Sequence, residues 1–349
     1  MPDIKILILF SIPIVLSLAA VPLMIRLGHS YNLLDYPGQH KRHKKPTPYL
    51  GGVGLFLVCW LTILIGWLIF PSYFAELKES ILFILFGSLI IGLVGFSDDM
   101  KPMSAWVKLL AQIGAGLLVY WGGLTVDLVN VPFFVVDMSR FSMIVTILWV
   151  VALTNAINLI DGLDGLAGGV SLIAAVMLFA VGMLKEAGAV IVIVQVLIGY
   201  LLIFWYFNRY PAKIFLGDSG SMQIGFLFAV FSLSYSLKSY TTAALYIPML
   251  ALGVPLLEIS TSFVRRLISG KNVMKADRRH LFHYLALFGL SPKQIVWVFY
   301  LLALVYGLFA LAMFFWDRTL VFSFLLIFMV VIFALFFILM VKFIPRKKL

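Results

Sequence analysis

Two carboxylates and two carboxamides lie close together in the segment from residue 155 to 169, which reads NAINLIDGLDGLAGG. Asn158, Asp161 and Asp164 are three residues apart, so they would share one side of a helix end. The segment ends an apolar run long enough to cross a membrane, where an ionisable side chain costs free energy unless it binds an ion, a partner or a substrate. We therefore expect this segment to bind a metal ion or a phosphate group.

Another apolar run ends in two adjacent acids, Asp98 and Asp99. Neighbouring carboxylates repel each other, so the pair favours a bound cation or a carboxyl group kept protonated for acid–base chemistry. A solvated helix end is the alternative, and it would be the better interpretation of an isolated pair. Because other polar clusters accompany the pair, we expect Asp98 and Asp99 to be catalytic.

Asp218 lies in the segment GDSG, where the glycines allow the backbone to approach a ligand closely. Carboxylates that leave coordination positions open suit Mg²⁺, which keeps several waters and binds substrate phosphates. An ordinary turn that caps the next helix is the alternative. On its own this segment is weak evidence for a metal site, and Asp218 is a candidate ligand.

The longest basic loop extends from Arg265 to Lys293 and contains the segment DRRHLFH at residues 277–283. Arginine and histidine donate hydrogen bonds to phosphate and diphosphate groups. Contact with anionic lipid headgroups would explain the arginines, but it would not explain two histidines three residues apart beside an acid. The loop is therefore a candidate phosphate-binding segment.

Membrane helices must position these clusters. The chain has 349 residues, of which 63% are hydrophobic and 12% charged, a composition outside the range of soluble domains. Since about 20 apolar residues make one helical span, the sequence predicts an all-α, polytopic integral membrane protein, with a single domain over residues 1–349. The eleven predicted spans are residues 4–27, 51–70, 80–97, 105–123, 141–159, 166–184, 188–207, 220–237, 240–264, 295–316 and 320–343.

The distribution of Lys and Arg predicts the orientation of the spans. An odd number of spans puts the termini on opposite sides, and an outer N-terminus puts 20 of the 26 Lys and Arg residues on the inner side. We therefore predict that the C-terminus is cytoplasmic.

The first span has no cleavage pattern after it, so we interpret it as a membrane span that is not cleaved off. Cys59 is the only cysteine, which excludes an intramolecular disulfide and a cysteine metal cluster.

The predicted inner loops, unlike the outer ones, carry dense groups of charged, glycine or histidine residues. Acids at helix ends on one membrane face commonly converge, so we expect one active site at the cytoplasmic face. The only outer loop of any length, residues 126–141, is predicted to be a short extended segment without chemistry. The five inner segments are residues 35–52, 95–101, 155–169, 208–220 and 265–293.

These side chains favour metal-assisted phosphoryl transfer, in which a metal ion bridges phosphate oxygens and positioned groups orient the nucleophile. The sequence has no serine-hydrolase elbow, zinc His–Glu helix motif or Walker-type phosphate loop.

A transporter or lipid flippase is the competing class, and it predicts acids near the membrane midplane. Only Glu258 fits that pattern; its burial demands a partner, and a structural hydrogen bond is as good an interpretation as a functional one. A non-catalytic scaffold would have no reason to gather aspartates on one face.

The chain resembles the polyprenyl-phosphate N-acetylhexosamine-1-phosphate transferases of glycosyltransferase family 4, and in particular the bacterial undecaprenyl-phosphate N-acetylglucosaminyl 1-phosphate transferase group. The resemblance covers most of the chain and rests on motifs in a specific order. They are DYP at 35–37 with HKKPTPYLGG at 43–52, DD at 98–99 with KLLAQ at 108–112, the segment 155–169, FLGDSGS at 215–221, and ADRRHLFH at 276–283.

The resemblance implies an eleven-helix enzyme of the bacterial inner membrane that initiates a cell-surface glycan. Such an enzyme moves N-acetylglucosamine 1-phosphate from UDP-N-acetylglucosamine to undecaprenyl phosphate and releases UMP. Mg²⁺ is the implied cofactor, with Mn²⁺ as the alternative. Membrane lipids are further partners, no nucleic acid is expected, and a homodimer is left open. Another UDP-N-acetylhexosamine, such as a GalNAc or deoxy-amino sugar donor, is the alternative substrate, because small pocket changes decide between such sugars.

The resemblance also implies a role for individual side chains. The implied catalytic residues are Asp98 and Asp99, and the implied metal ligands are Asp218, Asp164 and Asp98. The implied substrate-binding residues are Lys44, Lys45, Lys108, Asn155, Asn158, Asp161, Arg265, Arg266, Asp277, Arg278, His280 and His283.

Two positions depart from the family pattern. Phe282 occupies a position where many relatives have histidine, and Glu258 stands where relatives tend to have aspartate.

The mechanism of the implied reaction depends on the charge of the lipid phosphate. This phosphate is ionised near neutral pH, because the second pKa of ordinary phosphate monoesters is about 6. This favours direct in-line attack on the β-phosphorus of the donor, with Asp98 or Asp99 as base or metal-tuning group. A two-step route through an aspartyl phosphate is the rival.

Overall fold

The structure, a computed structural model, describes residues 4–37, 45–131, 134–184, 188–238, 252–268 and 281–343. Helices dominate these residues, which confirms the all-α class. The α-helices are α1 (Ile4–Ser30), α2 (Gly51–Ile69), α3 (Ile81–Met100), α4 (Ala105–Trp121), α5 (Ser142–Ile160), α6 (Leu166–Leu184), α7 (Ile191–Asn208), α8 (Gly217–Lys238), α10 (Gly253–Ile268), α11 (Leu281–Leu287), α12 (Pro292–Phe315) and α13 (Arg318–Phe343).

Eight of the described helices are long and apolar enough to cross a membrane, and α4 is a shorter apolar helix. This agrees with a polytopic membrane protein. The count of eleven stays a prediction, because part of the predicted ninth span, residues 240–264, lies outside the described residues. The predicted loop over residues 265–293 is wrong at two places: α10 continues to Ile268, and residues 281–287 form the short helix α11.

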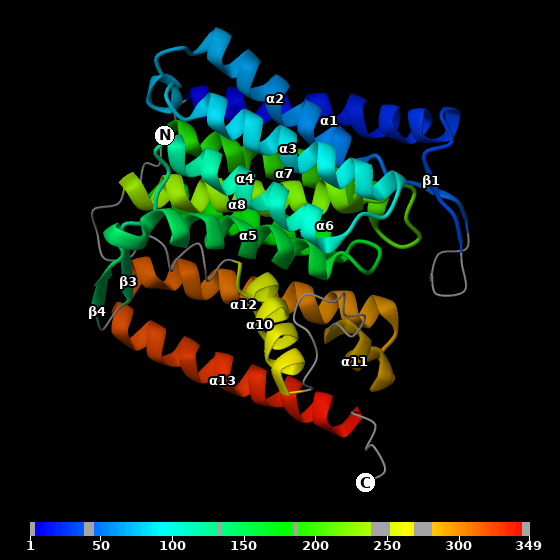
Figure 1. Cartoon of the computed structure of the whole chain (residues 1–349), viewed down its shortest axis with the longest axis vertical. Helices are drawn as coiled ribbons and strands as arrows, with labels where there is room; N and C mark the ends of the chain where they lie inside the picture. Colours follow the sequence, from blue (N-terminus) through cyan, green and yellow to red (C-terminus); the bar gives the residue numbers. More distant parts are fainter. Residues whose placement is uncertain are drawn as a thin grey trace.

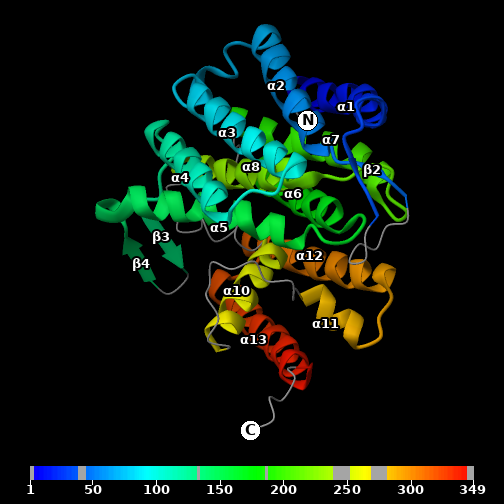
Figure 2. The same cartoon turned by 45° about the vertical axis from the view of Figure 1, so that its right-hand side comes forward.

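Helix α8 lies at the centre of the helix stack. Figures 1 and 2 show it among α3, α4, α5, α6 and α7, and it packs closely on α2, α3 and α5. Its side chains from Ser219 to Ser234 are buried on every side of the helix. A helix that is buried all round belongs to a core, so the first turn of α8, which carries Asp218, is held by several neighbours at once.

Two short hairpins mark the two ends of the helices. β1 (Leu34–Asp35) pairs antiparallel with β2 (Thr47–Pro48), and β3 (Leu128–Val131) pairs antiparallel with β4 (Phe134–Asp137). Figure 1 shows β1 and the β3–β4 hairpin at opposite ends of the stack. The second hairpin confirms the predicted extended segment at residues 126–141.

Candidate active site

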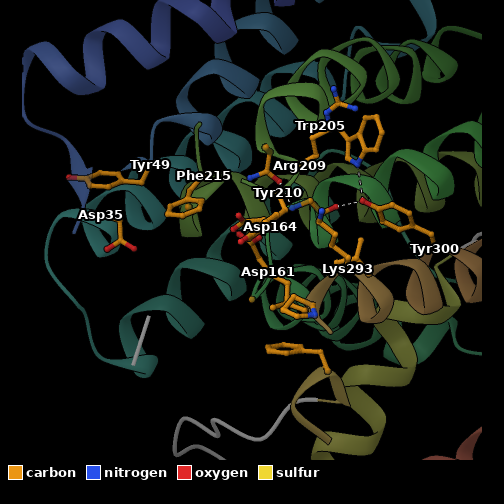
Figure 3. A pocket seen from close by; sticks show the side chains of 18 of the residues that line it. Asp35, Tyr49, Asp161, Asp164, Trp205, Arg209, Tyr210, Phe215, Lys293 and Tyr300 are labelled. Atoms are coloured by element: carbon orange, nitrogen blue, oxygen red, sulfur yellow. Dashed lines mark hydrogen bonds between the residues drawn. The ribbon is translucent and has the colours of Figure 1, made fainter. Parts of the chain in front are cut away.

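One cavity of about 1270 Å³ receives side chains from all five polar segments predicted to converge. Figure 3 shows Asp161 and Asp164 in its middle, with Asp35 and Tyr49 to one side and Trp205 and Tyr300 to the other. The five segments therefore converge on one cavity, while its role as the active site stays a prediction. The lining residues are Asp35, Tyr49, Asp99, Asp161, Gly162, Leu163, Asp164, Gly165, Trp205, Asn208, Arg209, Tyr210, Phe215, Gly217, Asp218, Phe282, His283, Pro292, Lys293, Val296, Trp297 and Tyr300.

Side chains from two other helices bind the Asp218 carboxylate. The Lys108 ammonium on α4 donates to Asp218 Oδ2 at 2.8 Å and to Asp98 Oδ2 at 3.1 Å. Asn158 Nδ2 on α5 donates to Asp218 Oδ1 at 3.1 Å and to the Ser221 hydroxyl at 2.9 Å. Both carboxylate oxygens of Asp218 thus have partners, and the cation of Lys108 offsets part of the negative charge. Such contacts fix the orientation of a carboxylate more firmly than a neutral hydrogen bond would.

Asp99 caps the N-terminus of α8. Its Oδ1 accepts the backbone N–H of Asp218 at 2.7 Å, and its Oδ2 accepts the backbone N–H of Ser219 at 3.1 Å. The first N–H groups of a helix have no partner within the helix, and a carboxylate there also interacts favourably with the helix dipole. Gly217 precedes Asp218 with a φ of 73°, a conformation that favours glycine, and its Cα faces the Asp99 carboxylate. Asp99 therefore positions the main chain that carries Asp218.

We expect Asp99→Asn to lower the stability of the protein by about 1–2 kcal/mol, because an amide can accept only one of the two N–H groups and carries no charge. The apparent melting temperature of the purified protein in detergent measures this loss. Asp317→Asn is the matched control, since Asp317 Oδ1 caps α13 through a single bond to Leu320 N of 2.9 Å at an exposed site, and asparagine caps such a site equally well. Equal melting temperatures for both variants would contradict the capping role of Asp99.

The turn after α5 carries the other two acids. Asp164 Oδ2 accepts the backbone N–H of Ala212 at 3.0 Å, and Asn208 Oδ1 accepts that of Gly165 at 3.0 Å. Gly165 has a φ of 79°, so glycine is favoured there. Asp161 differs, because its carboxylate accepts no hydrogen bond from the described part of the chain. Low-polarity surroundings raise the pKa of Asp161 to about 8, and repulsion by Asp218, Asp99 and Asp164 acts in the same direction.

The predicted residues do not all lie on the cavity. Asp98 is not among the lining residues; besides Lys108 it accepts the backbone N–H of Met103 at 2.7 Å. Asn155 lies one helical turn deeper, where its Nδ2 donates to Gln112 Oε1 at 2.6 Å, so it joins α5 to α4 rather than facing the cavity. Asn158 and Lys108 reach the cavity only through Asp218.

The last basic segment reaches the cavity through α11. His283 and Phe282 both line it, with ring centroids 4.2 Å apart. A Cβ atom at Gly162 would lie 2.3 Å from the Phe282 ring, so this ring packs directly on the turn that carries Asp161. Phe282 therefore forms part of the cavity wall beside Asp161.

Lys45 is an exposed residue just before β2 and does not line the cavity. Other predicted site residues have no side-chain description. Arg265 and Arg266 belong to α10, but only their backbone is described. The residues outside the described ranges are Lys44, Asp277, Arg278 and His280.

Glu258 makes a structural contact. It is fully buried on α10, and both of its carboxylate oxygens accept the backbone N–H of Leu281 at 3.2 Å. This bond joins α10 to the start of α11, the helix that brings His283 to the cavity. The structural interpretation of Glu258 is thus supported.

One side of the cavity consists of aromatic and basic side chains that the sequence did not single out. Trp205 Nε1 donates to the Tyr300 hydroxyl at 2.8 Å, which joins the end of α7 to α12. Trp, Tyr, Arg and Lys are common at the ends of membrane helices, so their presence carries little signal in the sequence alone. The residues of this group are Trp205, Arg209, Tyr210, Lys293, Trp297 and Tyr300.

The oxygen ligands on the cavity fit a hard divalent cation such as Mg²⁺. Asp99, Asp161, Asp164 and Asp218 all line it, and the Asp161 carboxylate is free of hydrogen bonds from the described chain. Within the described ranges no three acidic, histidine or cysteine side chains group closely enough to hold a metal unaided. Mg²⁺ commonly takes only one or two carboxylates and completes its shell with waters and substrate phosphates. One or two of Asp161, Asp164 and Asp218, and not all three together, would therefore hold it.

Known proteins are similar to this chain in its central region and over most of its length. The family model described as glycosyl transferase family 4 matches residues 81–236. A probable undecaprenyl-phosphate N-acetylglucosaminyl 1-phosphate transferase from Bacillus subtilis (strain 168) is 32% identical over 336 residues, which is 95% of this chain and 90% of the relative. The decaprenyl-phosphate N-acetylglucosaminephosphotransferase of Mycobacterium tuberculosis (strain ATCC 25618 / H37Rv) is 32% identical, with 79% of this chain and 74% of that protein covered. A phospho-N-acetylmuramoyl-pentapeptide-transferase from Staphylococcus aureus (strain Newman) is 29% identical, with 86% and 95% covered.

Proposed function

The chain belongs to glycosyl transferase family 4, and from this we propose that it transfers N-acetylglucosamine 1-phosphate from UDP-N-acetylglucosamine to undecaprenyl phosphate and releases UMP. The observation that carries the proposal is the convergence of Asp99, Asp161, Asp164 and Asp218 on one cavity at the ends of membrane helices. An acceptor dissolved in the bilayer and a donor dissolved in water must meet at such a boundary. The 20 inner Lys and Arg residues support a cytoplasmic position for this end of the protein, where UDP-sugars are made.

The proposed reaction exchanges one phosphorus–oxygen bond for another. An oxygen of the lipid phosphate forms a bond to the β-phosphorus of the donor, and the bond from that phosphorus to the bridging oxygen breaks, so the electron pair leaves with UMP. Mg²⁺, when bound, would neutralise charge that develops on the phosphate oxygens. Lys108 keeps Asp218 oriented and lowers the negative charge that two phosphorylated substrates meet.

Direct attack is the route that we propose. Asp99 has both oxygens engaged with α8, and Asp98 has both engaged with Lys108 and Met103. A phosphate nucleophile that is already ionised needs no general base, so these structural contacts are compatible with catalysis. Chemical trapping of a phosphorylated aspartate in the absence of lipid acceptor would favour the two-step route instead.

We propose N-acetylglucosamine as the sugar because the Bacillus subtilis and Mycobacterium tuberculosis relatives carry that sugar in their names. The Staphylococcus aureus relative, which is named for a muramoyl pentapeptide, shows that similarity alone leaves the donor open. Another UDP-N-acetylhexosamine is therefore the second candidate. The Phe282 ring packs on Gly162 and lines the cavity beside the turn that carries Asp161.

We expect the purified full-length protein to release UMP from UDP-N-acetylglucosamine only when undecaprenyl phosphate and Mg²⁺ are both present. The measurement is UMP formation by chromatography, with EDTA-treated protein and with UDP-N-acetylmuramoyl pentapeptide as the comparison reactions. Mn²⁺ should restore part of the activity, because it also accepts carboxylate and phosphate oxygens. Absence of metal-dependent UMP from every UDP-N-acetylhexosamine tested would overturn the proposal.

A further inference from the structure

Two cations on the rim of the cavity have no acidic partner in the described part of the chain. Arg209 follows α7, Lys293 lies in the first turn of α12, and both line the cavity. Neither side chain donates a hydrogen bond or forms an ion pair with any described residue. The acids lie further in, so the cavity has an acidic interior and a basic rim. Two neighbouring cations without acidic partners, at the edge of a cavity, form a binding surface for an anion.

Exposed aromatic rings accompany both cations. Arg209 Cζ lies 4.7 Å from the ring centroid of Tyr206, and Lys293 Nζ lies 5.4 Å from that of Tyr210. Contact with a ring face leaves N–H donors of both cations available for an anion. Tyr210 is 59% exposed and Trp297 is 69% exposed. Such rings at the ends of membrane helices lie at the level of the lipid headgroups.

The rim is preorganised by hydrogen bonds that join its two helices. Trp205 Nε1 donates to the Tyr300 hydroxyl at 2.8 Å, and that hydroxyl donates to the carbonyl of Gly165 at 2.5 Å. The end of α7, which precedes Arg209, is therefore fixed relative to α12, which carries Lys293. Groups that are held in place before a ligand arrives lose less entropy when it binds.

We infer that Arg209, Lys293 and the rings beside them bind the phosphate headgroup of an anionic membrane lipid. An apolar surface continues from the rim along α12, where Trp297 and Leu301 are one turn apart and more than 60% exposed. This surface fits acyl chains and would have no use in binding a free phosphate ion. The cations line the same cavity as the acids, but lipid binding at the rim can be tested by lipid titration without any assay of the proposed transferase activity.

The test uses the full-length protein, stripped of lipid in a neutral detergent and titrated with dioleoyl phosphatidylglycerol or dioleoyl phosphatidylcholine. Native mass spectrometry counts the lipids bound at each concentration. Each Lys or Arg near an anionic lipid contributes about 1 kcal/mol, which is a factor of about five in affinity. We therefore expect Arg209→Gln and Lys293→Gln each to weaken phosphatidylglycerol binding about fivefold. The double variant should weaken it more than either single variant, without strict additivity, because both cations contact one headgroup.

Lys78→Gln with Arg140→Gln is the matched control, because both cations are exposed and precede helices α3 and α5 at the ends opposite the cavity. The control pair should leave phosphatidylglycerol binding unchanged, and the phosphatidylcholine affinity should be the same in all variants. Size-exclusion profiles and melting temperatures identify any variant that fails to fold, and in that case the single variants decide the outcome. Unchanged phosphatidylglycerol binding in the folded double variant, or equal affinity of the wild type for both lipids, would overturn the inference. Displacement of the lipid by an equal concentration of inorganic phosphate would likewise assign the rim to a free anion.

Discussion

Asp218→Asn is expected to reduce UMP release about 1000-fold, because it removes a charge from the place where two phosphates and a divalent cation would meet. Removal of a single preorganised electrostatic contact commonly costs 100-fold to 1000-fold in turnover, and this carboxylate lies on the cavity between Lys108 and Asn158. Asparagine is nearly isosteric and retains one oxygen that can accept the bond from Asn158. The loss should therefore appear in turnover while the protein remains folded.

The measurement is the initial rate of UMP release at saturating donor, acceptor and Mg²⁺, together with the Mg²⁺ concentration that gives half of the maximal rate. Asp317→Asn serves as the control for the chemical change, since Asp317 caps α13 at an exposed site after the far end of α12. Asp218→Asn should also raise the Mg²⁺ requirement if any rate remains. A variant that keeps a tenth of the wild-type rate at an unchanged Mg²⁺ requirement would remove Asp218 from the proposed metal site.

The membrane helices could be predicted from the sequence because each depends on the length of an apolar run. The predicted spans 51–70 and 166–184 differ from α2 (Gly51–Ile69) and α6 (Leu166–Leu184) by at most one residue. Helix α8 was predicted from residue 220 but begins at Gly217. The difference arises because the cap of α8 is Asp99, 119 residues away from Asp218 in the chain, and capping motifs in a sequence are local.

The convergence of the five polar segments was also predictable, because a bilayer forces polar helix ends to one face or the other. The different positions and contacts of the individual polar side chains could not be predicted. Adjacent Asp98 and Asp99 are equivalent in the sequence, but only Asp99 lines the cavity. Asn155 and Asn158 are three residues apart, but the first pairs with Gln112 and the second with Asp218. These differences depend on which neighbouring helix each side chain meets.

Close approach of backbones is a further feature that the sequence does not reveal. Gly51 and Gly52 in the first turn of α2 donate their N–H groups to the carbonyls of Phe215 at 3.1 Å and Leu216 at 2.9 Å. These bonds dock the segment before Asp218 onto α2. The fit is tight enough to exclude a side chain, since a Cβ at Gly52 would lie 2.2 Å from the backbone nitrogen of Gly220. The position of Asp218 therefore depends on glycines in another helix.

Gly52→Ala should destabilise the protein by about 3 kcal/mol, at the upper end of the range for overpacked cores, because the clash involves backbone atoms that cannot rotate away. The same displacement would move the first turn of α8, and a misplacement of about 1 Å at a reacting group costs about 100-fold in rate. Gly114→Ala is the matched control, as Gly114 also lies in a helix but has no heavy atom within 4 Å of an added Cβ. Melting temperature and UMP release should both fall for Gly52→Ala. For Gly114→Ala the rate should be unchanged and the melting temperature unchanged or slightly higher, because alanine favours a helix more than glycine does. If Gly52→Ala kept wild-type stability and rate, the contact between α2 and α8 could not be what positions Asp218.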